Sequence, residues 1–110
     1  MSLLNLTPHT INYMSVNGEV IALPASGTVA RLPMRAQPVL VPGADFTCTT
    51  VIYGAVEGVP AVGEGPFIVS AMVLAKLGVE YRGQAFAPDT GPTAVRENGL
   101  VKYVTGFITV

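Results

Sequence analysis

Glycine and proline divide this chain into short segments. Twelve glycines and nine prolines are spread over 110 residues. The segments between them are rich in Val, Ile, Thr, Tyr and Phe, which fit the pleated, half-buried surface of a β-strand. Strands are expected at residues 3–6, 28–32, 38–41, 46–55 and 104–110. This pattern predicts a single domain over residues 1–110 of the all-β class, mainly antiparallel, folded as a small barrel or sandwich of about six to eight short strands.

Two Asn-Gly pairs predict β-hairpins. Asn17-Gly18 and Asn98-Gly99 each separate two strand-like runs. Both residues of such a pair tolerate positive φ, so the pair favours a two-residue type I′ turn. The turns fix two registers, which pair Met14 with Ile21, Tyr13 with Ala22, Glu97 with Leu100, Arg96 with Val101 and Val95 with Lys102.

One segment departs from the strand pattern. A short apolar strand at 66–69 is followed by Ser70, by seven mostly helix-forming residues, and then by Gly78. Serine is a favoured N-cap and glycine a favoured residue just after a helix. We therefore expect one short helix near 70–77, largely buried because it is apolar almost all round. Residues 54–65 and 82–92 are expected to be long irregular connections.

The composition points to a protein that hides apolar surface. Half of the chain is hydrophobic and only 12% is charged, which favours a homo-oligomer over a monomer with a surface rich in Thr, Ser, Asn and Gly. Six basic and seven acidic residues are scattered, so no patch for duplex nucleic acid is expected. No apolar run is long enough to span a membrane, and the N-terminus lacks a signal-peptide pattern. A cytoplasmic location is expected.

Metal and cofactor sites find little support in the sequence. The chain has one cysteine, Cys48, and one histidine, His9. A single cysteine excludes an internal disulfide, and no ligand pair stands at a spacing that would hold zinc or calcium. The Gly-rich segment 54–65 matches no phosphate-binding motif. No metal and no cofactor are expected.

The densest polar run is residues 87–99. Pro88, Asp89, Thr90 and Gly91 have turn chemistry, but the turn alone does not require the polar residues that follow. A site needs convergent polar groups, and the candidates for ligand binding are Asp89, Thr90, Thr93 and Arg96. The alternative is that Asp89 caps the turn and pairs with Arg96.

Two further residues are candidates for a site. Arg31 is costly in so uncharged a chain unless it pairs with an acid or binds an anion such as carboxylate or phosphate. His9 follows Pro8 at an expected kink and is either held in a turn or available as a ligand contact or general base. A small hydrolase would need His9 to meet Asp89 or Ser70. Ser70 lacks the glycines of a nucleophile elbow and is expected to act as an N-cap.

Five segments, NLTPHTI, PASGTVARL, YGAVEGVP, FIVSAMV and APDTGPTAVRENG, occur in this order along nearly the whole chain. Together they resemble a group of small uncharacterised proteins encoded by tailed phages and by prophages in bacterial genomes. The resemblance implies an accessory protein that acts in the bacterial cytoplasm. It implies no reaction and no functional residues, because the group has no assigned activity.

These observations favour a non-enzymatic phage or prophage accessory protein that binds a host protein or sequesters a small, anionic ligand. No convincing catalytic set is visible. The alternatives are a small structural or assembly component of a phage particle and a small hydrolase that uses His9.

Overall fold

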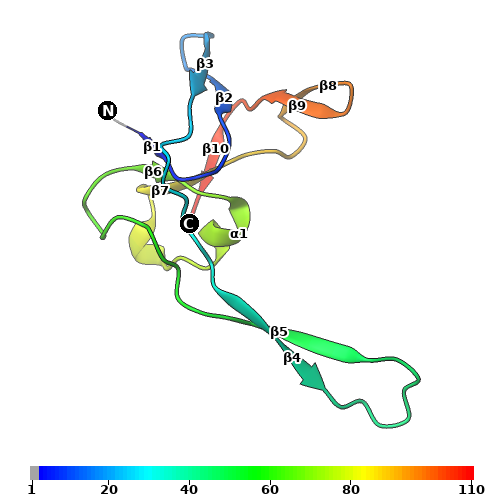
Figure 1. Cartoon of the computed structure of the whole chain (residues 1–110). Helices are drawn as coiled ribbons and strands as arrows, with labels where there is room; N and C mark the ends of the chain where they lie inside the picture. Colours follow the sequence, from blue (N-terminus) through cyan, green and yellow to red (C-terminus); the bar gives the residue numbers. More distant parts are fainter. Residues whose placement is uncertain (1–2) are drawn as a thin grey trace.

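The computed structural model describes residues 3–110, and most of its elements are strands (Figure 1). The elements are β1 (Leu4–Asn5), β2 (Ile11–Met14), β3 (Val20–Leu23), β4 (Met34–Val39), β5 (Cys48–Tyr53), β6 (Phe67–Ile68), α1 (Ala71–Ala75), the 3-10 helix η1 (Val79–Tyr81), β7 (Ala85–Pro88), β8 (Val95–Glu97), β9 (Leu100–Tyr103) and β10 (Phe107–Thr109). The predicted all-β character is confirmed.

The strands form four small sheets. One mixed sheet has the order β1-β6-β7-β10, and the hairpins β2-β3, β4-β5 and β8-β9 are separate two-stranded sheets. β1, β6 and β7 are parallel to one another, and β10 is antiparallel to β7. Within residues 3–110 no barrel closes, so the expected barrel is wrong. The segment 28–32, expected as a strand, contributes only a single bridge between Arg31 and Glu57.

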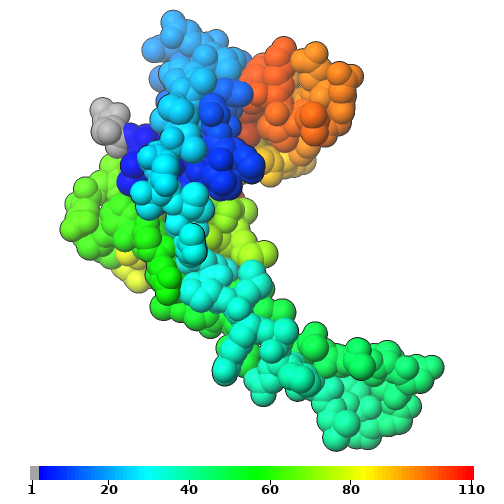
Figure 2. Space-filling view, viewed as in Figure 1, coloured from blue at the N-terminus to red at the C-terminus, as the bar shows by residue number. Residues whose placement is uncertain are grey.

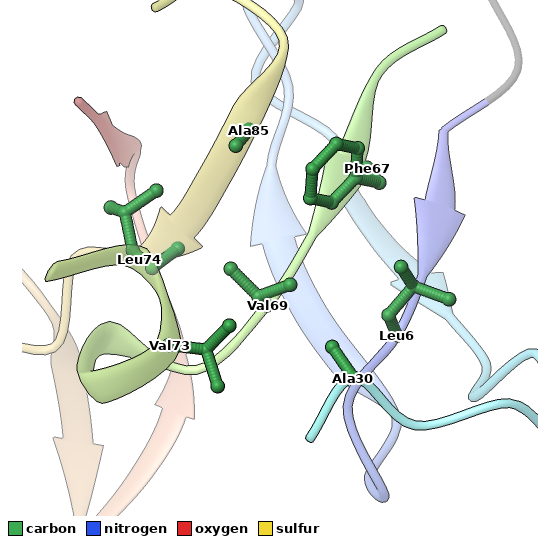
Figure 3. Close-up of a cluster of buried hydrophobic side chains, with 8 residues drawn as sticks. Leu6, Ala30, Phe67, Val69, Val73, Leu74 and Ala85 are labelled. Carbon is green, nitrogen blue, oxygen red and sulfur yellow. The ribbon is translucent and has the colours of Figure 1, made fainter. Parts of the chain in front are cut away.

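The mixed sheet carries the main core (Figure 3). Phe67 and Val69 are fully buried, and they pack with Leu6, Ala30 and the two helix residues Val73 and Leu74. A second cluster of Ile11, Ile68 and Val104 lies where the hairpins join the sheet. The edge of the Phe67 ring meets Tyr81 with 5.8 Å between ring centroids.

β7 occupies a segment expected to be an irregular connection. Ala85 and Ala87 are fully buried, and the strand lies between β6 and β10. Alanine has weak strand propensity and Pro88 discourages a strand prediction. Small side chains suit this position because α1 packs directly against β7. Tertiary packing, which local propensity does not report, therefore makes this segment a strand.

The predicted helix forms, but it is shorter and less buried than expected. Ser70 is the N-cap, and its Oγ accepts a hydrogen bond from the Val73 amide at 3.3 Å. Val73 and Leu74 are buried, while Met72 on the outer face is 54% exposed. Gly78 has φ −78° and is the N-cap of the 3-10 helix η1, whereas α1 already ends at its C-cap Lys76, so Gly78 does not follow the helix directly as expected. Only one face of α1 meets the sheet, which leaves the other in solvent.

The first hairpin is shifted by one residue from its expected register. Tyr13 pairs with Ile21, where the sequence predicted Met14 in that place. Gly18 has φ +81°, but Asn17 does not have positive φ, so the predicted type I′ turn is wrong. The Ser15 Oγ accepts a hydrogen bond from the Asn17 amide at 3.3 Å. This local bond favours a three-residue loop closed by a single left-handed glycine.

The second hairpin has the predicted turn. Asn98 and Gly99 have φ of 54° and 80°, as a type I′ turn requires. Glu97 pairs with Leu100 and Arg96 with Val101, as expected. The next pair is wrong, because a bulge after Val95 places that residue opposite Tyr103 and not opposite Lys102.

The β4-β5 hairpin, residues 34–53, projects away from the rest of the molecule as an arm (Figures 1 and 2). The molecule measures 59 × 38 × 24 Å and its radius of gyration is 17.1 Å, whereas a compact chain of this length would have about 13 Å. The strands expected at 38–41 and 46–55 form this arm, with the first displaced toward the N-terminus. In the described part of the chain, no helix is long and apolar enough to cross a membrane.

Candidate functional site

A buried asparagine organises the loop that carries His9. Asn5 is 1% exposed, and its Nδ2 donates to the carbonyl oxygens of His9 and Leu23 at 2.9 and 3.0 Å. Its Oδ1 accepts from the amide and the hydroxyl of Thr7 at 3.0 and 2.7 Å. These four bonds satisfy the polar groups of a tight bend that Pro8 introduces. The backbone of His9 is therefore held in place, while its side chain is exposed.

His9 and Thr90 share the walls of two adjoining open hollows. The first, of about 340 Å³, lies where β2 faces β9 and includes Lys102 in its lining. The second, of about 390 Å³, extends toward the start of α1 and includes Thr7 and Ser70. The structure thus brings together two of the predicted site residues that are distant in sequence. We call this pair of hollows the His9 surface.

Asp89 and Arg96 do not form the ion pair that the sequence suggested. The Asp89 Oδ1 accepts from the Gly91 amide at 3.1 Å and closes the turn. The Arg96 guanidinium instead donates to the carbonyl oxygen of Thr90 at 2.6 Å. The ion pair that does form within residues 3–110 joins the Lys102 ammonium to the Glu97 carboxylate at 3.4 Å. The alternative interpretation of this run was that Asp89 caps the turn and pairs with Arg96. Its first part is right, and its second part is wrong.

The remaining candidates lie apart from the His9 surface. The carbonyl oxygen of Thr93 accepts from the Thr105 hydroxyl at 3.1 Å, which ties the loop before β8 to the loop before β10. Arg31 lines a different hollow with Leu32, Pro33 and Glu57. The backbones of Arg31 and Glu57 exchange hydrogen bonds of 2.9 and 2.8 Å. The six candidates therefore do not converge on one ligand.

The His9 surface lacks the contacts of a hydrolytic site. The Ser70 hydroxyl, the candidate nucleophile that lines the second hollow, is engaged as the cap of α1. A nucleophile needs a base within hydrogen-bond reach and a group that orients the base. Among the hydrogen bonds of residues 3–110, none joins the His9 ring to a hydroxyl or carboxylate. The described residues also contain no group of three or more His, Cys, Asp or Glu side chains able to hold a metal ion.

The arm is the feature that sequence reasoning missed. It carries eight of the large hydrophobic residues that are exposed in the structure, namely Met34, Val39, Leu40, Val41, Phe46, Val51, Ile52 and Tyr53. Only Arg35 and Asp45 are charged among residues 34–53. The available signal was this apolar stretch of low charge, which contains the Pro42-Gly43 turn. The sequence predicts strands here but not their exposure, because strands of this composition are usually buried.

The base of the arm is anchored to the body. The Lys76 ammonium, just after α1, lies 4.4 Å from the centroid of the Tyr53 ring. The Gly54 amide donates to the Pro33 carbonyl at 2.8 Å. Both contacts lie where the arm joins the body, so the remainder of the hairpin is left without cover from residues 3–110 (Figure 2). An isolated two-stranded hairpin is only marginally stable in water.

Comparison with known proteins adds no assignment, since no protein-family model, no curated protein and no solved structure matches this chain.

Proposed function

We propose that this chain is a non-enzymatic binding protein whose arm is its protein-contacting surface. The observation that carries the proposal is the exposure of eight large hydrophobic residues on one projecting hairpin. Exposed apolar patches of this extent mark interaction sites, because their burial in a complex is favourable. The proposal that the protein serves a phage or prophage in the bacterial cytoplasm is supported by the resemblance of the five sequence segments.

A structural or assembly role is a second candidate. The elongated shape, 59 Å in its longest dimension, and the arm that extends from a small body favour a component that links to neighbouring subunits. Such an arm reaches a neighbour without requiring the two bodies to touch. Both candidates place the contact on the arm and differ in the identity of the partner.

Sequestration of a small anionic ligand has weaker support. Lys102 lines the first hollow beside His9 and Thr90, but its charge is already paired with Glu97. The Arg96 guanidinium is committed to a backbone carbonyl. The charged side chains near the His9 surface therefore have protein partners, whereas the apolar residues of the arm are exposed.

The proposed binding function is tested by substituting the arm without altering the body. A double variant, Leu40→Ser with Phe46→Ser, removes two of the most exposed apolar side chains, which are 90% and 63% exposed. We expect wild-type protein to migrate as a stoichiometric complex, with itself or with another protein, in sedimentation velocity. The double variant is expected to lose that complex and to keep the thermal midpoint of the wild type.

Met72→Ser with Val79→Ser is the matched control, because both residues are exposed and apolar but lie on the body. We expect this variant to retain the complex. The proposed function is refuted if wild-type protein is a free monomer at every concentration and in extracts of its native cell. It is also refuted if the arm and body variants lose the complex equally.

A further inference from the structure

The two edges of the arm differ in their capacity to accept another strand. The Gly54 amide bonds to the Pro33 carbonyl, so residues 33 and 54 form a hydrogen-bonded pair. Hydrogen-bonded and non-bonded pairs alternate along an antiparallel ladder. The register of β4 with β5 then decides which backbone groups are left unpaired within the hairpin. Residues 34, 36 and 38 of β4 and residues 49, 51 and 53 of β5 direct their N–H and C=O groups to the outer edges, away from the paired strand.

The outer edge of β4 is protected against pairing. Pro38 has no N–H, and it occupies one of the three outward positions on this edge. Arg35 adds the only charge within the two strands. Proline and charged residues on an exposed edge are the usual devices that prevent association with another strand.

The outer edge of β5 has no such protection. Thr49, Val51 and Tyr53 each direct an N–H and a C=O outward, and no strand within residues 3–110 pairs with them. The sequence of β5, Cys-Thr-Thr-Val-Ile-Tyr, has no charge, no proline and no glycine. It combines β-branched and aromatic residues of high strand propensity. An uncharged edge of this kind pairs readily with another strand.

We propose that β5 pairs antiparallel with β5 of a second copy of this chain, across a twofold axis at Val51. The two arms then form one four-stranded sheet in the order β4-β5-β5-β4. Val51 lies opposite its own symmetry mate, and Thr49 lies opposite Tyr53 of the other copy. This inference rests on the proposed binding function of the arm and identifies its partner.

Self-complementarity favours a second copy over a different protein. A twofold interface uses the same patch on both subunits, and antiparallel pairing about Val51 satisfies every outward group of Thr49, Val51 and Tyr53. β5 carries no charge, so two copies do not repel each other. For the same reason β5 offers no electrostatic feature that would select a partner of opposite charge.

The proposed pairing also brings together apolar side chains beside the β5 edge. Val51, Ile52 and Tyr53 are among the large hydrophobic residues exposed in the structure, and each comes next to β5 of the other copy. In the four-stranded sheet, both outer edges are the protected β4 edges. The sheet therefore ends at four strands and does not extend into a fibre.

The geometry is tested by disulfide trapping. In a Cys48→Ser background, Val51→Cys places two thiols on opposed residues whose Cα atoms lie about 5.5 Å apart in a hydrogen-bonded antiparallel pair, within disulfide range. Ala36→Cys is the matched control, because Ala36 is the register partner of Val51 on the protected edge. The two β4 strands of the dimer are three strand spacings, about 14 Å, apart.

We expect Val51→Cys to yield a covalent dimer under mild oxidation and Ala36→Cys to remain monomeric on a non-reducing gel. Equal cross-linking of the two variants, or none from Val51→Cys, would overturn the proposed pairing. The yield is measured at the lowest protein concentration that gives signal, so that random collisions do not produce the dimer.

A proline variant separates this inference from the proposed function. Val51→Pro removes an outward N–H and leaves the β4-β5 ladder intact, and the edge of a sheet tolerates proline in this orientation. It abolishes both hydrogen bonds of the central pair in the dimer. We expect the dimer dissociation constant, measured by sedimentation equilibrium, to rise on the order of a hundredfold. A dimer that Val51→Pro leaves unchanged overturns the inference.

The remaining outcome is a wild-type monomer that still loses a complex with another protein when Leu40 and Phe46 are substituted. That result would overturn the second copy as the partner and would leave the proposed binding function standing. A wild-type monomer with no complex of any kind would refute both.

Discussion

Replacement of Asn5 by alanine is expected to destabilise the protein more than most substitutions of a polar residue. The Asn5 side chain is 1% exposed and takes part in four hydrogen bonds. It connects β1 to the His9 loop and to the end of β3. Its loss leaves the Leu23 carbonyl, the His9 carbonyl and the Thr7 amide without this partner.

The magnitude follows from those contacts. A typical intramolecular hydrogen bond contributes about 0.5–1.5 kcal/mol net, and a buried group left unpaired costs about 1–3 kcal/mol. Four lost bonds therefore predict that Asn5→Ala lowers the free energy of unfolding by about 3–5 kcal/mol. Small domains have a total stability of about 5–15 kcal/mol. The variant is therefore expected to remain folded only under the conditions in which the protein is most stable.

The measurement is equilibrium unfolding in urea, with Asn12→Ala as the control. Asn12 is exposed, and its Nδ2 makes one long hydrogen bond of 3.5 Å to the Lys102 carbonyl. The same change there is expected to cost less than about 1 kcal/mol. Faster hydrogen exchange at the Thr7 amide would locate the effect of Asn5→Ala. A loss below about 1 kcal/mol, equal to that of the control, would refute the role assigned to Asn5.

Three further predictions concern the core, a turn and the arm. Phe67→Ala removes a fully buried ring and its edge-to-face contact with Tyr81, and thermal unfolding should show a loss of about 3–5 kcal/mol. Gly99→Ala meets no neighbour but places a side chain at φ +80°, which should cost about 1 kcal/mol in urea unfolding. Lys76→Ala removes the cation from the Tyr53 ring, so the base of the arm should be cut faster by limited proteolysis, while Lys76→Arg should preserve the wild-type rate.

The elements that the sequence predicted correctly are those with strong local determinants. The N-cap serine at position 70 and the Asn98-Gly99 turn act through backbone groups a few residues away, so both could be identified without tertiary information. The predicted Asn17-Gly18 turn does not form, because the Ser15 Oγ accepts a hydrogen bond from the Asn17 amide and the loop lengthens to three residues. The prediction for the β7 segment was wrong for the opposite reason, since its alanines form a strand only through packing against α1 and β6.

The candidate site could be predicted only in part. His9 and Thr90 are far apart in sequence and meet because Asn5 fixes the His9 loop beside the turn that Asp89 caps. No local pattern reports that contact. Arg96 and Asp89 are close in sequence, which made an ion pair plausible, yet each has a nearer backbone partner. Backbone groups at a turn compete effectively with a charged side chain for hydrogen bonds.

The distribution of apolar residues connects the composition to the arm. The high hydrophobic fraction, half of the chain, would be expected to fill a core, but the buried hydrophobic residues come almost entirely from the mixed sheet, α1 and adjoining segments. Residues 34–53 contribute none of them and instead hold many of the exposed ones. A chain whose apolar residues served only its own core would not need to place Leu40 and Phe46 at the end of a projecting hairpin. The proposed burial of the arm in an assembly would account for both the composition and the shape.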